Sequence, residues 1–200
     1  NKYVYVTANN LSAYFPHRFR ISYSQTELTQ DTGSIKHPIV REAVKLLGFS
    51  DGGIDINTMA DIPAGTGMGS SSTFTVSLLH ALHAAKHELI SKEALANQAC
   101  ELEISRLGEP IGKQDAYAAT YGGINTFRFL SDGRVSVEPV PLSSDIQAAL
   151  VDRLLLFYLG GNRSASSILK EQSNNSSANV SELETMRDQA LACAKAFRSF

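Results

Sequence analysis

Apolar and polar residues alternate in several short stretches of the chain, which predicts β-strands with one buried face. Tyrosine and valine alternate over residues 2–7, and apolar side chains recur at every second position from Phe19 to Tyr23. Side chains along a strand point to opposite faces in turn, so a period of two indicates a half-buried strand. The other expected strands are residues 54–59, a hairpin of 125–130 and 135–140 around Ser131-Asp132-Gly133, and a buried strand at 154–158.

Between these strands, apolar residues recur every three or four positions, which predicts helices. Pro38 opens a helix that continues to Leu47 and ends at Gly48, and Ser91 is placed to cap a helix over residues 93–106. The other expected elements are helices over 70–87, 113–121 and 180–200, a helix that begins at Ser164, and an exposed loop at 172–179. Because strands and helices mix without a regular βαβ alternation, the sequence favours an α+β fold.

Composition narrows the class of protein. The chain has 200 residues, of which 43% are hydrophobic and 19% charged, with a net charge of −2. This balance is typical of a globular protein and excludes disordered, collagen-like and coiled-coil chains. The charge gives no basic field, and no apolar run reaches the ~18 residues of a membrane helix, so neither nucleic acid nor a membrane is an expected partner. Cys100 and Cys193 are interpreted as reduced thiols, so a cytoplasmic location is expected.

Two domains are expected, divided at a break in the pattern between residues 141 and 152. Residues 1–145 are expected to form the first domain, and residues 146–200 the beginning of the second. The chain starts within a strand pattern, without Met, and stops within a helical pattern. We therefore expect it to be the middle of a longer protein.

The segment Asp61-Ile62-Pro63-Ala64-Gly65-Thr66-Gly67-Met68-Gly69-Ser70-Ser71-Ser72-Thr73 is the strongest candidate for a binding site. It leads from an expected strand into an expected helix. Glycine at every second position allows positive φ angles and a close approach of the backbone to a ligand. The helix start adds free N–H groups, and the serine hydroxyls add donors or an oxygen ligand for Mg²⁺. We expect a phosphate site here; the alternative is a glycine-rich turn with a serine cap.

Neither of the two best-known phosphate loops matches this segment. A Walker A loop ends in Gly-Lys-Ser/Thr, and no lysine stands here. A dinucleotide-binding loop needs a third glycine where Ser70 stands.

A second stretch of the sequence carries two acidic residues that could meet. Glu103 lies late in one expected helix and Asp115 early in the next, joined by the loop Gly108-Glu109-Pro110-Ile111-Gly112. If that loop folds one helix back beside the other, both carboxylates lie at one site. Phosphoryl transfer needs one group that holds the metal and nucleotide and another that accepts or orients the substrate hydroxyl proton. Taken singly, each carboxylate is more typical of a solvated surface acid.

Together these stretches resemble the GHMP kinases, which include galactokinase, homoserine kinase and mevalonate kinase. The second motif of this family reads Pro-x-x-x-Gly-Leu-Gly-Ser-Ser, and residues 63–71 follow it with Met68 at the leucine position. Glu103, Pro110 and Asp115 are similar to the family's downstream Glu, Pro and Asp. The branch that acts on D-glycero-D-manno-heptose 7-phosphate looks most similar, on the segments 108–115, 121–123, 155–158 and 163–166.

The resemblance implies a fold and a set of site residues. The implied fold is an N-terminal ribosomal protein S5 domain 2-like α+β domain, followed by part of a C-terminal ferredoxin-like α+β domain. ATP and Mg²⁺ are the implied cofactors, with Ser71 and Glu103 as metal ligands and Asp115 as base or orienter beside the sugar hydroxyl. The implied site for the ATP phosphates comprises Pro63, Gly65, Thr66, Gly67, Met68, Gly69, Ser70, Ser71 and Ser72.

The resemblance also implies a reaction, the transfer of the ATP γ-phosphate to the anomeric hydroxyl of D-glycero-D-manno-heptose 7-phosphate. A kinase for another sugar, such as L-fucose or galactose, and a non-catalytic nucleotide-binding module stay open as alternatives, and a homodimer is compatible with the family. The family's first motif is expected before Asn1 and its third after Phe200. We therefore expect little turnover from these 200 residues alone.

Several single residues are weaker candidates. His80, His83 and His87 share a helix face and are spaced for a metal, although packing is the more common role. Lys113 lies beside Asp115 and is a candidate contact for a substrate phosphate. The other candidates are Arg18, Arg20, Lys36 and Arg163 for the substrate phosphate, and Tyr3, Tyr5 and Tyr117 for a pocket wall or, more commonly, the core.

Overall fold

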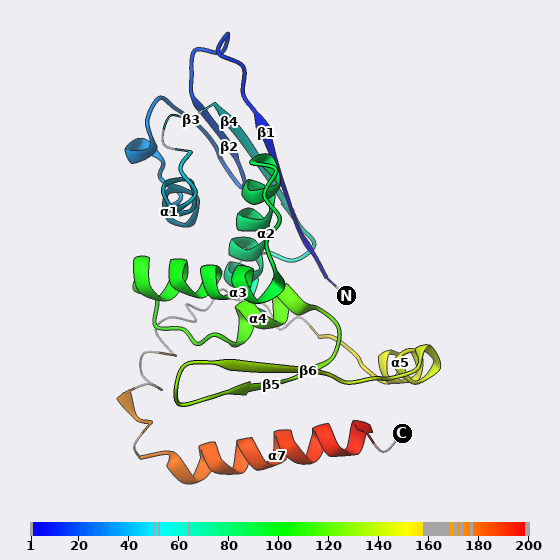
Figure 1. Cartoon of the computed structure of the whole chain (residues 1–200). Helices are drawn as coiled ribbons and strands as arrows, with labels where there is room; N and C mark the ends of the chain where they lie inside the picture. The colour runs from blue at the N-terminus through cyan, green and yellow to red at the C-terminus, as the bar shows by residue number, and fades with distance from the viewer. Residues whose placement is uncertain are drawn as a thin grey trace. The chain divides into compact units, whose positions relative to one another are not determined.

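The computed structural model describes residues 2–49, 51, 53–63, 65–157, 169, 172, 174–176 and 178–198. The chain divides into two compact units (Figure 1). The first is Asn1–Thr120 with Asn162–Ser166, and the second is Tyr121–Gly161 with Ser167–Phe200. The units divide at residue 120, whereas the expected domain boundary lies at residue 145, which stays a prediction.

The first unit is built on a four-stranded mixed sheet. Its strands are β1 (Val4–Asn10), β2 (Phe19–Ser22), β3 (Thr26–Thr29) and β4 (Ile54–Ala60), in the order β1-β4-β2-β3. β4 pairs antiparallel with β1 and parallel with β2, so that Val4 lies opposite Ala60, and Phe19 opposite Ile54. β2 and β3 form an antiparallel pair. β3 is the strand of this sheet that the sequence analysis does not expect, because four residues show too little alternation.

The unit also contains helices, of which α2 packs against the sheet through β1. They are α1 (Pro38–Leu46), α2 (Ser70–Ala85), α3 (Lys92–Cys100), α4 (Gln114–Tyr121), the 3₁₀ turn η1 (Thr32–Ser34) and the π-helix η2 (Glu101–Arg106). Figure 1 shows α2 along the sheet with α1 beside it. Strand and helix side chains at most 1% exposed form the core between them: Phe19, Ile21, Ile54, Ile56, Leu78, Leu79 and Leu82. The fold is therefore α+β, as predicted.

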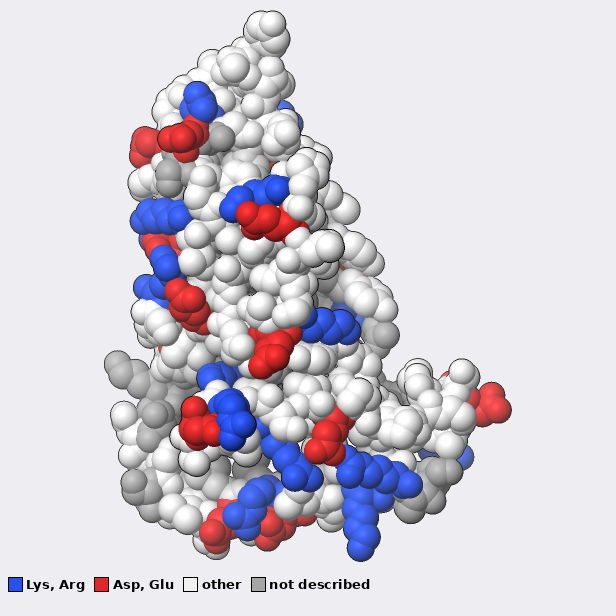
Figure 2. All heavy atoms as spheres, viewed as in Figure 1, with Lys and Arg blue, Asp and Glu red and all other residues white. Residues whose placement is uncertain are grey.

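The opposite face of the sheet is polar and open. Asp55 lies opposite Arg20 across the parallel strands, and the two form an ion pair. A hydrogen bond from Arg20 lowers the pKa of Asp55 and outweighs the opposing effect of its burial. Tyr5 and Met59, paired across β1 and β4, are 49% and 67% exposed. Figure 2 shows basic side chains beside acidic ones over much of the face in view, which matches the small net charge.

The described residues of the second unit include a hairpin and the helices α5 and α7. The hairpin is β5 (Asn125–Phe129) and β6 (Val135–Pro139), with the predicted turn between them. The helices are α5 (Ser144–Val151) and α7 (Val180–Arg198). α5 replaces the break expected at 141–152, and the Ser143 hydroxyl caps it by accepting from the Ile146 N–H at 3.3 Å. Most of the helix expected from Ser164 lies outside the described residues, but Leu169, which is described, is helical. In the segment expected as a loop at 172–179, Gln172 and Asn174 are helical, and residues 173 and 177 lie outside the described residues.

The buried strand predicted at residues 154–158 is wrong for the four residues that the structure describes. Residues 154–157 form no strand, and their side chains are 65–81% exposed. An apolar run is buried only where another element packs on it, and the described strands of this unit pair only with each other. Across the described residues, no helix is long and apolar enough to span a membrane.

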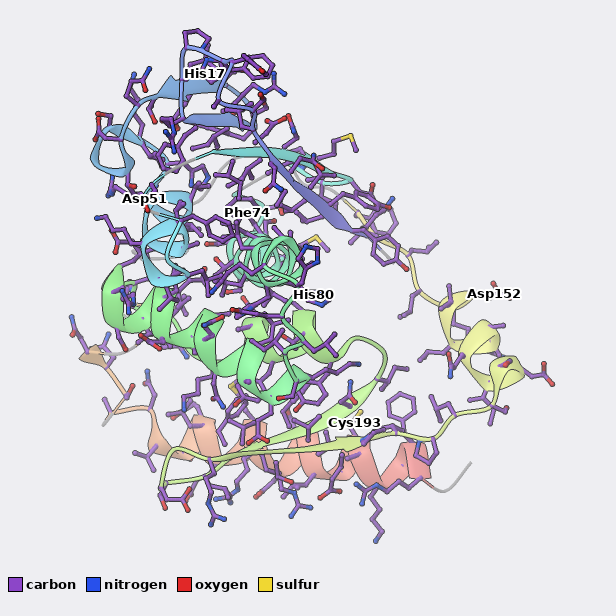
Figure 3. All side chains as sticks on the ribbon, turned by 45° about the horizontal axis from the view of Figure 1, so that its top comes forward. His17, Asp51, Phe74, His80, Asp152 and Cys193 are labelled. Carbon is purple, nitrogen blue, oxygen red and sulfur yellow. The ribbon has the colours of Figure 1, made fainter. Side chains whose placement is uncertain are left out.

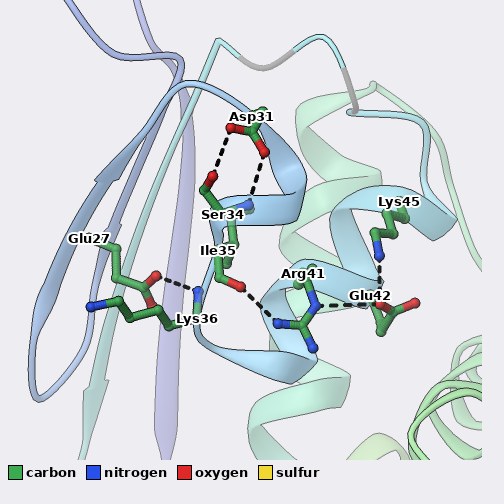
Figure 4. A network of polar contacts seen from close by, with 8 residues as sticks. All are labelled: Glu27, Asp31, Ser34, Ile35, Lys36, Arg41, Glu42 and Lys45. Carbon is green, nitrogen blue, oxygen red and sulfur yellow. Dashed lines mark hydrogen bonds and ion pairs between the residues drawn. The ribbon is translucent and has the colours of Figure 1, made fainter.

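A buried carboxylate holds the segment that leads into α1 (Figure 4). Glu27, on β3, is 7% exposed and accepts hydrogen bonds from the N–H groups of Lys36 and His37, at 2.6 and 3.1 Å. The Tyr23 hydroxyl donates to it as well, at 2.9 Å. Burial raises the pKa of Glu27, but these hydrogen bonds and the His37 charge outweigh it, so the pKa lies below its usual value. The ionised carboxylate therefore stabilises the fold.

We predict that Glu27→Gln lowers the free energy of unfolding by about 1–3 kcal/mol at pH 7. The side-chain NH₂ group of glutamine would face a hydroxyl or N–H group that donates to Glu27 in the wild type, so hydrogen bonds would be lost. A lowered folded-state pKa gives stability that is present above the unfolded pKa and is lost as the pH falls through the folded one. The difference in the free energy of unfolding between wild type and variant should thus shrink as the pH falls from about 5 to about 3. Urea unfolding across this range measures it, with Glu42→Gln, which breaks a surface ion pair, as the control. An equal difference at both ends of the range would contradict the prediction.

Candidate functional site

The glycine-rich loop between β4 and α2 has the backbone conformation that its sequence predicts. Gly65, Gly67 and Gly69 have φ angles of +80°, +73° and +69°. For residues with a Cβ this left-handed conformation costs about 1–2 kcal/mol. Pro63, Gly65 and Gly67 are exposed, so this part of the loop lies open to solvent. The path of the loop therefore depends on its alternating glycines.

The loop ends at the start of α2, where Gly69 is the N-cap residue and supplies no side-chain cap. The hydroxyl and the N–H of Thr73 both donate to the Gly69 carbonyl oxygen, at 2.8 and 2.9 Å, and close the first turn. The first N–H groups of a helix have no partner within it, and the helix dipole adds positive potential there. This helix start fits an anion such as phosphate, and the phosphate site stays a prediction.

The three serines after the loop differ in solvent exposure. Ser71 is exposed and Ser70 half-buried, whereas Ser72 is 2% exposed. Of the three hydroxyls, those of Ser70 and Ser71 are the ones that an outside ligand can reach. In the loop itself, Met68 is 51% exposed, and the Thr66 hydroxyl is buried without a hydrogen-bond partner among the described residues.

Glu103 lies buried beside the start of α2, at 1% exposure. The Ser71 hydroxyl donates to its Oε1 at 2.7 Å. Its Oε2 is also buried and has no hydrogen-bond partner among the described residues. An unsatisfied buried polar atom costs about 1–3 kcal/mol, and more when it is charged. This arrangement fits a carboxylate that binds a cation, and oxygen atoms are the ligands that Mg²⁺ prefers.

A π-helix sets the position of Glu103. The helix predicted over residues 93–106 is α-helical only as far as Cys100 and continues as η2. At its end the N–H of Leu107 donates to the carbonyl oxygen of Leu102 at 3.0 Å, five residues back. π-helical segments are rare and are often found at functional sites. Apolar spacing does not distinguish this wider turn from an α-helix, so the sequence gives no sign of it.

Asp115 lies in the first turn of α4 and is exposed. Its side chain packs against Gly69, because a Cβ added to Gly69 would lie 3.1 Å from Cγ of Asp115 and 3.2 Å from Oδ2. The contact exists only because residue 69 has no side chain. The sequence prediction that the loop after Glu103 brings Asp115 back to the same site is thus met in the geometry.

The start of α2 therefore has a carboxylate on either side. Gly69 contacts Asp115, and two residues later Ser71 binds Glu103. One carboxylate is exposed and the other is buried. A buried carboxylate suits a bound cation, and an exposed one can meet a substrate that arrives from solvent. The catalytic and metal-binding roles themselves stay predictions.

Cys100 lies near Glu103, and its thiol is unreactive at pH 7. Burial raises the pKa of its thiol to about 11, with the Lys113 charge lowering the pKa and the Glu103 charge raising it. The thiol is therefore protonated at pH 7, and only a thiolate binds a metal or attacks a substrate. Cys100 is a free thiol, as predicted.

Two of the arginines predicted to contact a substrate phosphate already have partners. Arg20 binds Asp55 in a bidentate ion pair, with Nε 2.9 Å from Oδ1. The guanidinium of Arg18 donates to a backbone carbonyl oxygen. These contacts disfavour both as phosphate ligands. Of the other two candidates, Lys36 is exposed, and Arg163 lies outside the described residues.

His87, predicted to share a helix face with His80 and His83, lies beyond the end of α2 and has a φ angle of +59°. The described residues contain no cluster of three metal-ligating side chains, so these histidines form no metal site there. His83 is buried and uses both ring nitrogens, with Nδ1 2.9 Å from Glu88 Oε2 and Nε2 2.8 Å from Gln98 Oε1. His80 lies on the exposed side of the same helix (Figure 3). The packing role is the one that the structure supports for His83.

The tyrosines divide between core and surface. Tyr117 is 2% exposed, and its hydroxyl donates to Asn97 Oδ1 at 2.8 Å. Tyr3 and Tyr5 are about half-exposed, so the core role expected for them is wrong, because they lie on the open face of the sheet. Asn97 is missed by the sequence analysis, since a lone asparagine within a helix carries no signal of a partner 20 residues away.

We predict that Gly69→Ala costs more stability than Gly67→Ala. Both glycines have positive φ angles, so both variants carry the left-handed strain. Only at position 69 does the new methyl group meet Asp115, whereas nothing lies within 4 Å at position 67. The extra contact should lower the free energy of unfolding by a further ~1–3 kcal/mol in denaturant titrations. Equal losses in the two variants would show that Asp115 does not lie where the structure has it.

Residues 38–123 match the family profile described as the GHMP kinases N terminal domain. The matched range contains the glycine-rich loop, Glu103 and Asp115. The chain is 33% identical over 154 residues to the D-glycero-alpha-D-manno-heptose 7-phosphate kinase of Campylobacter jejuni. The aligned region covers 76% of this chain and 44% of that protein. It is 30% identical over 122 residues to the galactokinase of Pyrococcus furiosus, or 60% of this chain and 32% of that protein.

A solved structure has the same fold. It is described as a D-glycero-D-manno-heptose 1-phosphate kinase from Bacteroides thetaiotaomicron, with 26% sequence identity and a TM-score of 0.66 over 73% of this chain and 50% of that one. The chain spans less than half the length of the two curated relatives named above. The profile, the relatives and the fold agree: the chain is a member of the GHMP kinase family, whose N-terminal domain profile matches residues 38–123.

Proposed function

We propose that the protein is an ATP-dependent sugar kinase, and that the described part of the chain supplies its phosphate-binding loop and two of its acidic site residues. The observation that carries this proposal is the contact of Ser71 with Glu103 at the end of a glycine-rich loop. The second carboxylate oxygen of Glu103 is buried and has no partner within the described part of the chain. A structural carboxylate would be expected to have both oxygens satisfied. A kinase needs such a carboxylate beside its nucleotide phosphates.

The loop and the start of α2 would bind the ATP phosphates. The backbone from Gly65 to Ser71 forms the end of the loop and the start of α2, and its glycines, which have positive φ angles, carry no side chain that would keep a ligand from the backbone N–H groups. The N–H groups at the start of α2 would donate to phosphate oxygens, and the helix dipole would favour their negative charge. The reachable hydroxyls of Ser70 and Ser71 would add donors.

Ser71 and Glu103 would hold Mg²⁺. Their oxygens suit this cation, which usually takes one or two protein ligands together with phosphates and water. When bound, Mg²⁺ neutralises charge on the phosphates of the nucleotide. The Ser71 hydroxyl now donates to Glu103 Oε1, which holds the carboxylate in place and leaves Oε2 available to a cation.

Asp115 would accept or orient the proton of the substrate hydroxyl. Its carboxylate is exposed at the first turn of α4 and rests on Gly69, at the start of the helix that would hold the phosphates. A hydroxyl held by Asp115 would therefore lie near the transferred phosphoryl group. Positioned acid–base groups of this kind contribute typically about 10²–10⁴-fold to rate.

We propose D-glycero-D-manno-heptose 7-phosphate as the substrate, phosphorylated at its anomeric hydroxyl. The Campylobacter jejuni relative at 33% identity, named for that substrate, supports this proposal. Galactose is the second candidate, supported by the Pyrococcus furiosus galactokinase at 30% identity. ADP release by the full-length protein with Mg·ATP, tested on heptose 7-phosphate, unphosphorylated heptose, L-fucose and galactose, decides between them. Turnover on a plain sugar alone would overturn the heptose proposal, and silence on every sugar would favour a non-catalytic nucleotide-binding module.

We predict that Asp115→Ala lowers kcat by about 10²-fold or more while the Kd for Mg·ATP stays within about threefold of wild type. The reason is that Asp115 would act on the substrate hydroxyl, whereas the loop and Glu103 would hold the nucleotide. Steady-state kinetics and calorimetric titration with Mg·ATP measure the two quantities. The role given to Asp115 would be wrong if turnover and nucleotide binding fell in the same proportion.

We predict that Glu103→Gln raises the Mg²⁺ concentration needed for half-maximal nucleotide binding by about tenfold or more, because the amide removes the charge that would hold the cation. Glu101→Gln is the matched control, since Glu101 lies on the same π-helix but is exposed and paired with Arg106. Titration of nucleotide binding against Mg²⁺ measures both variants. If the two variants behave alike, Glu103 is not a metal ligand.

A further inference from the structure

Two helical segments carry the two carboxylates of the site, and a buried hydrogen bond joins them. α3 continues into η2 without a break, so Asn97 and Glu103 lie on one helical segment. α4 carries Asp115 and, two residues later, Tyr117. Residues two apart on a helix point about 200° apart, so Asp115 is exposed while Tyr117 is buried.

The hydroxyl of Tyr117 donates to Asn97 Oδ1 at 2.8 Å, although the ring lies in the core at 2% exposure. A buried hydroxyl without its acceptor is unfavourable, so this contact favours one placement of α4 against α3. Packing of an apolar ring alone would tolerate small shifts and rotations. The hydrogen bond is directional and therefore restricts both.

The connection between the two segments contains two glycines, whose backbone is less restricted than that of other residues. Gly108 has a φ angle of +69°, and nothing lies within 4 Å of a Cβ built on Gly108 or Gly112. The N–H of Glu109 donates to the carbonyl oxygen of Glu103, and that of Ile111 to the carbonyl oxygen of Glu109, which ties down the first half of the loop. The second half passes through Gly112 into α4. A hydrogen bond from within α4 itself adds a restraint on where Asp115 lies.

We infer that Tyr117 is a positioning residue, whose hydrogen bond to Asn97 holds α4 so that Asp115 rests on Gly69 beside the Ser71–Glu103 pair. This inference rests on the proposed function for its effect on turnover, but not for its effect on geometry. A misplacement of about 1 Å at a reacting group can cost about 10²-fold in rate. The hydroxyl of Tyr117 thus acts on the reaction through Asp115, without touching a substrate.

The test is Tyr117→Phe in the full-length protein, which keeps the ring and removes the hydroxyl. We expect kcat to fall by about tenfold or more, with the Kd for Mg·ATP within about twofold of wild type, because the nucleotide would be held by other elements. Asn97→Ala should have the same effect, Asn97→Asp should recover most of the loss because it keeps an acceptor, and the double variant Tyr117→Phe/Asn97→Ala should be no worse than either single one.

The matched control is Thr120→Val, on the same helix. Its hydroxyl donates to the carbonyl oxygen of Ala116 at 2.8 Å, so the variant loses a hydrogen bond within α4 but none to α3. We expect the kcat of this control to equal that of the wild type. An unchanged kcat in Tyr117→Phe, or an equal loss in Thr120→Val, would overturn the inference.

Crystal structures of the wild type and Tyr117→Phe give a readout that does not depend on turnover. We expect the Asp115 carboxylate to move away from Gly69 in the variant, and an unchanged position would overturn the inference. A wild-type protein that is silent on every sugar would count against the proposed function. The crystallographic comparison would still decide the role of Tyr117 in that case.

Discussion

The burial of the Glu103 carboxylate is the constraint on which the rest of the site depends. A carboxyl group at 1% exposure needs partners in place of water, and the chain supplies one to half of the group, the Ser71 hydroxyl that donates to Oε1. That contact joins the start of α2 to η2, two elements about 30 residues apart in the sequence. The other half, Oε2, has no partner among the described residues, which is the feature that points to a cation. A neutral side chain at position 103 would remove the cost of burying a carboxylate, and it would also remove the oxygen that could bind a cation.

The one-sided sheet explains why α2 can carry this site. Phe19, Ile21, Ile54 and Ile56 of the sheet are at most 1% exposed, and Leu78, Leu79 and Leu82 of α2 are fully buried. α2 packs along the sheet against β1, which fixes the helix and therefore its first turn. The glycines between β4 and α2 then allow a path that other residues would resist. Rigid packing on one side of α2 and an open backbone at its start are complementary requirements of a phosphate-binding loop.

The site also separates its two acidic residues by environment. Glu103 is buried on a helical segment that continues α3, whereas Asp115 is exposed on α4 and touches the N-cap glycine of α2. Two carboxylates in one environment would compete for the same proton or cation. Placed on either side of a helix start, one inside and one outside, they can serve different partners. The neutral thiol of Cys100 lies beside Glu103 without adding a third charge, because burial keeps it protonated.

The sequence by itself determined the elements whose causes are local. Alternation gave the central strands, the proline and serine signals gave the helix starts at Pro38 and Ser91, and the motif spacing gave the residues of the candidate site. Tertiary structure alone decided the π-turn at Glu103, the hydrogen bond from Tyr117 to Asn97, and the exposure of residues 154–157. These features depend on which surfaces meet, and a period of apolar residues shows that a face is apolar but not what covers it. For that reason the chain's own pattern identified Glu103 and Asp115 as candidates, and only packing showed that they lie on either side of the same helix start.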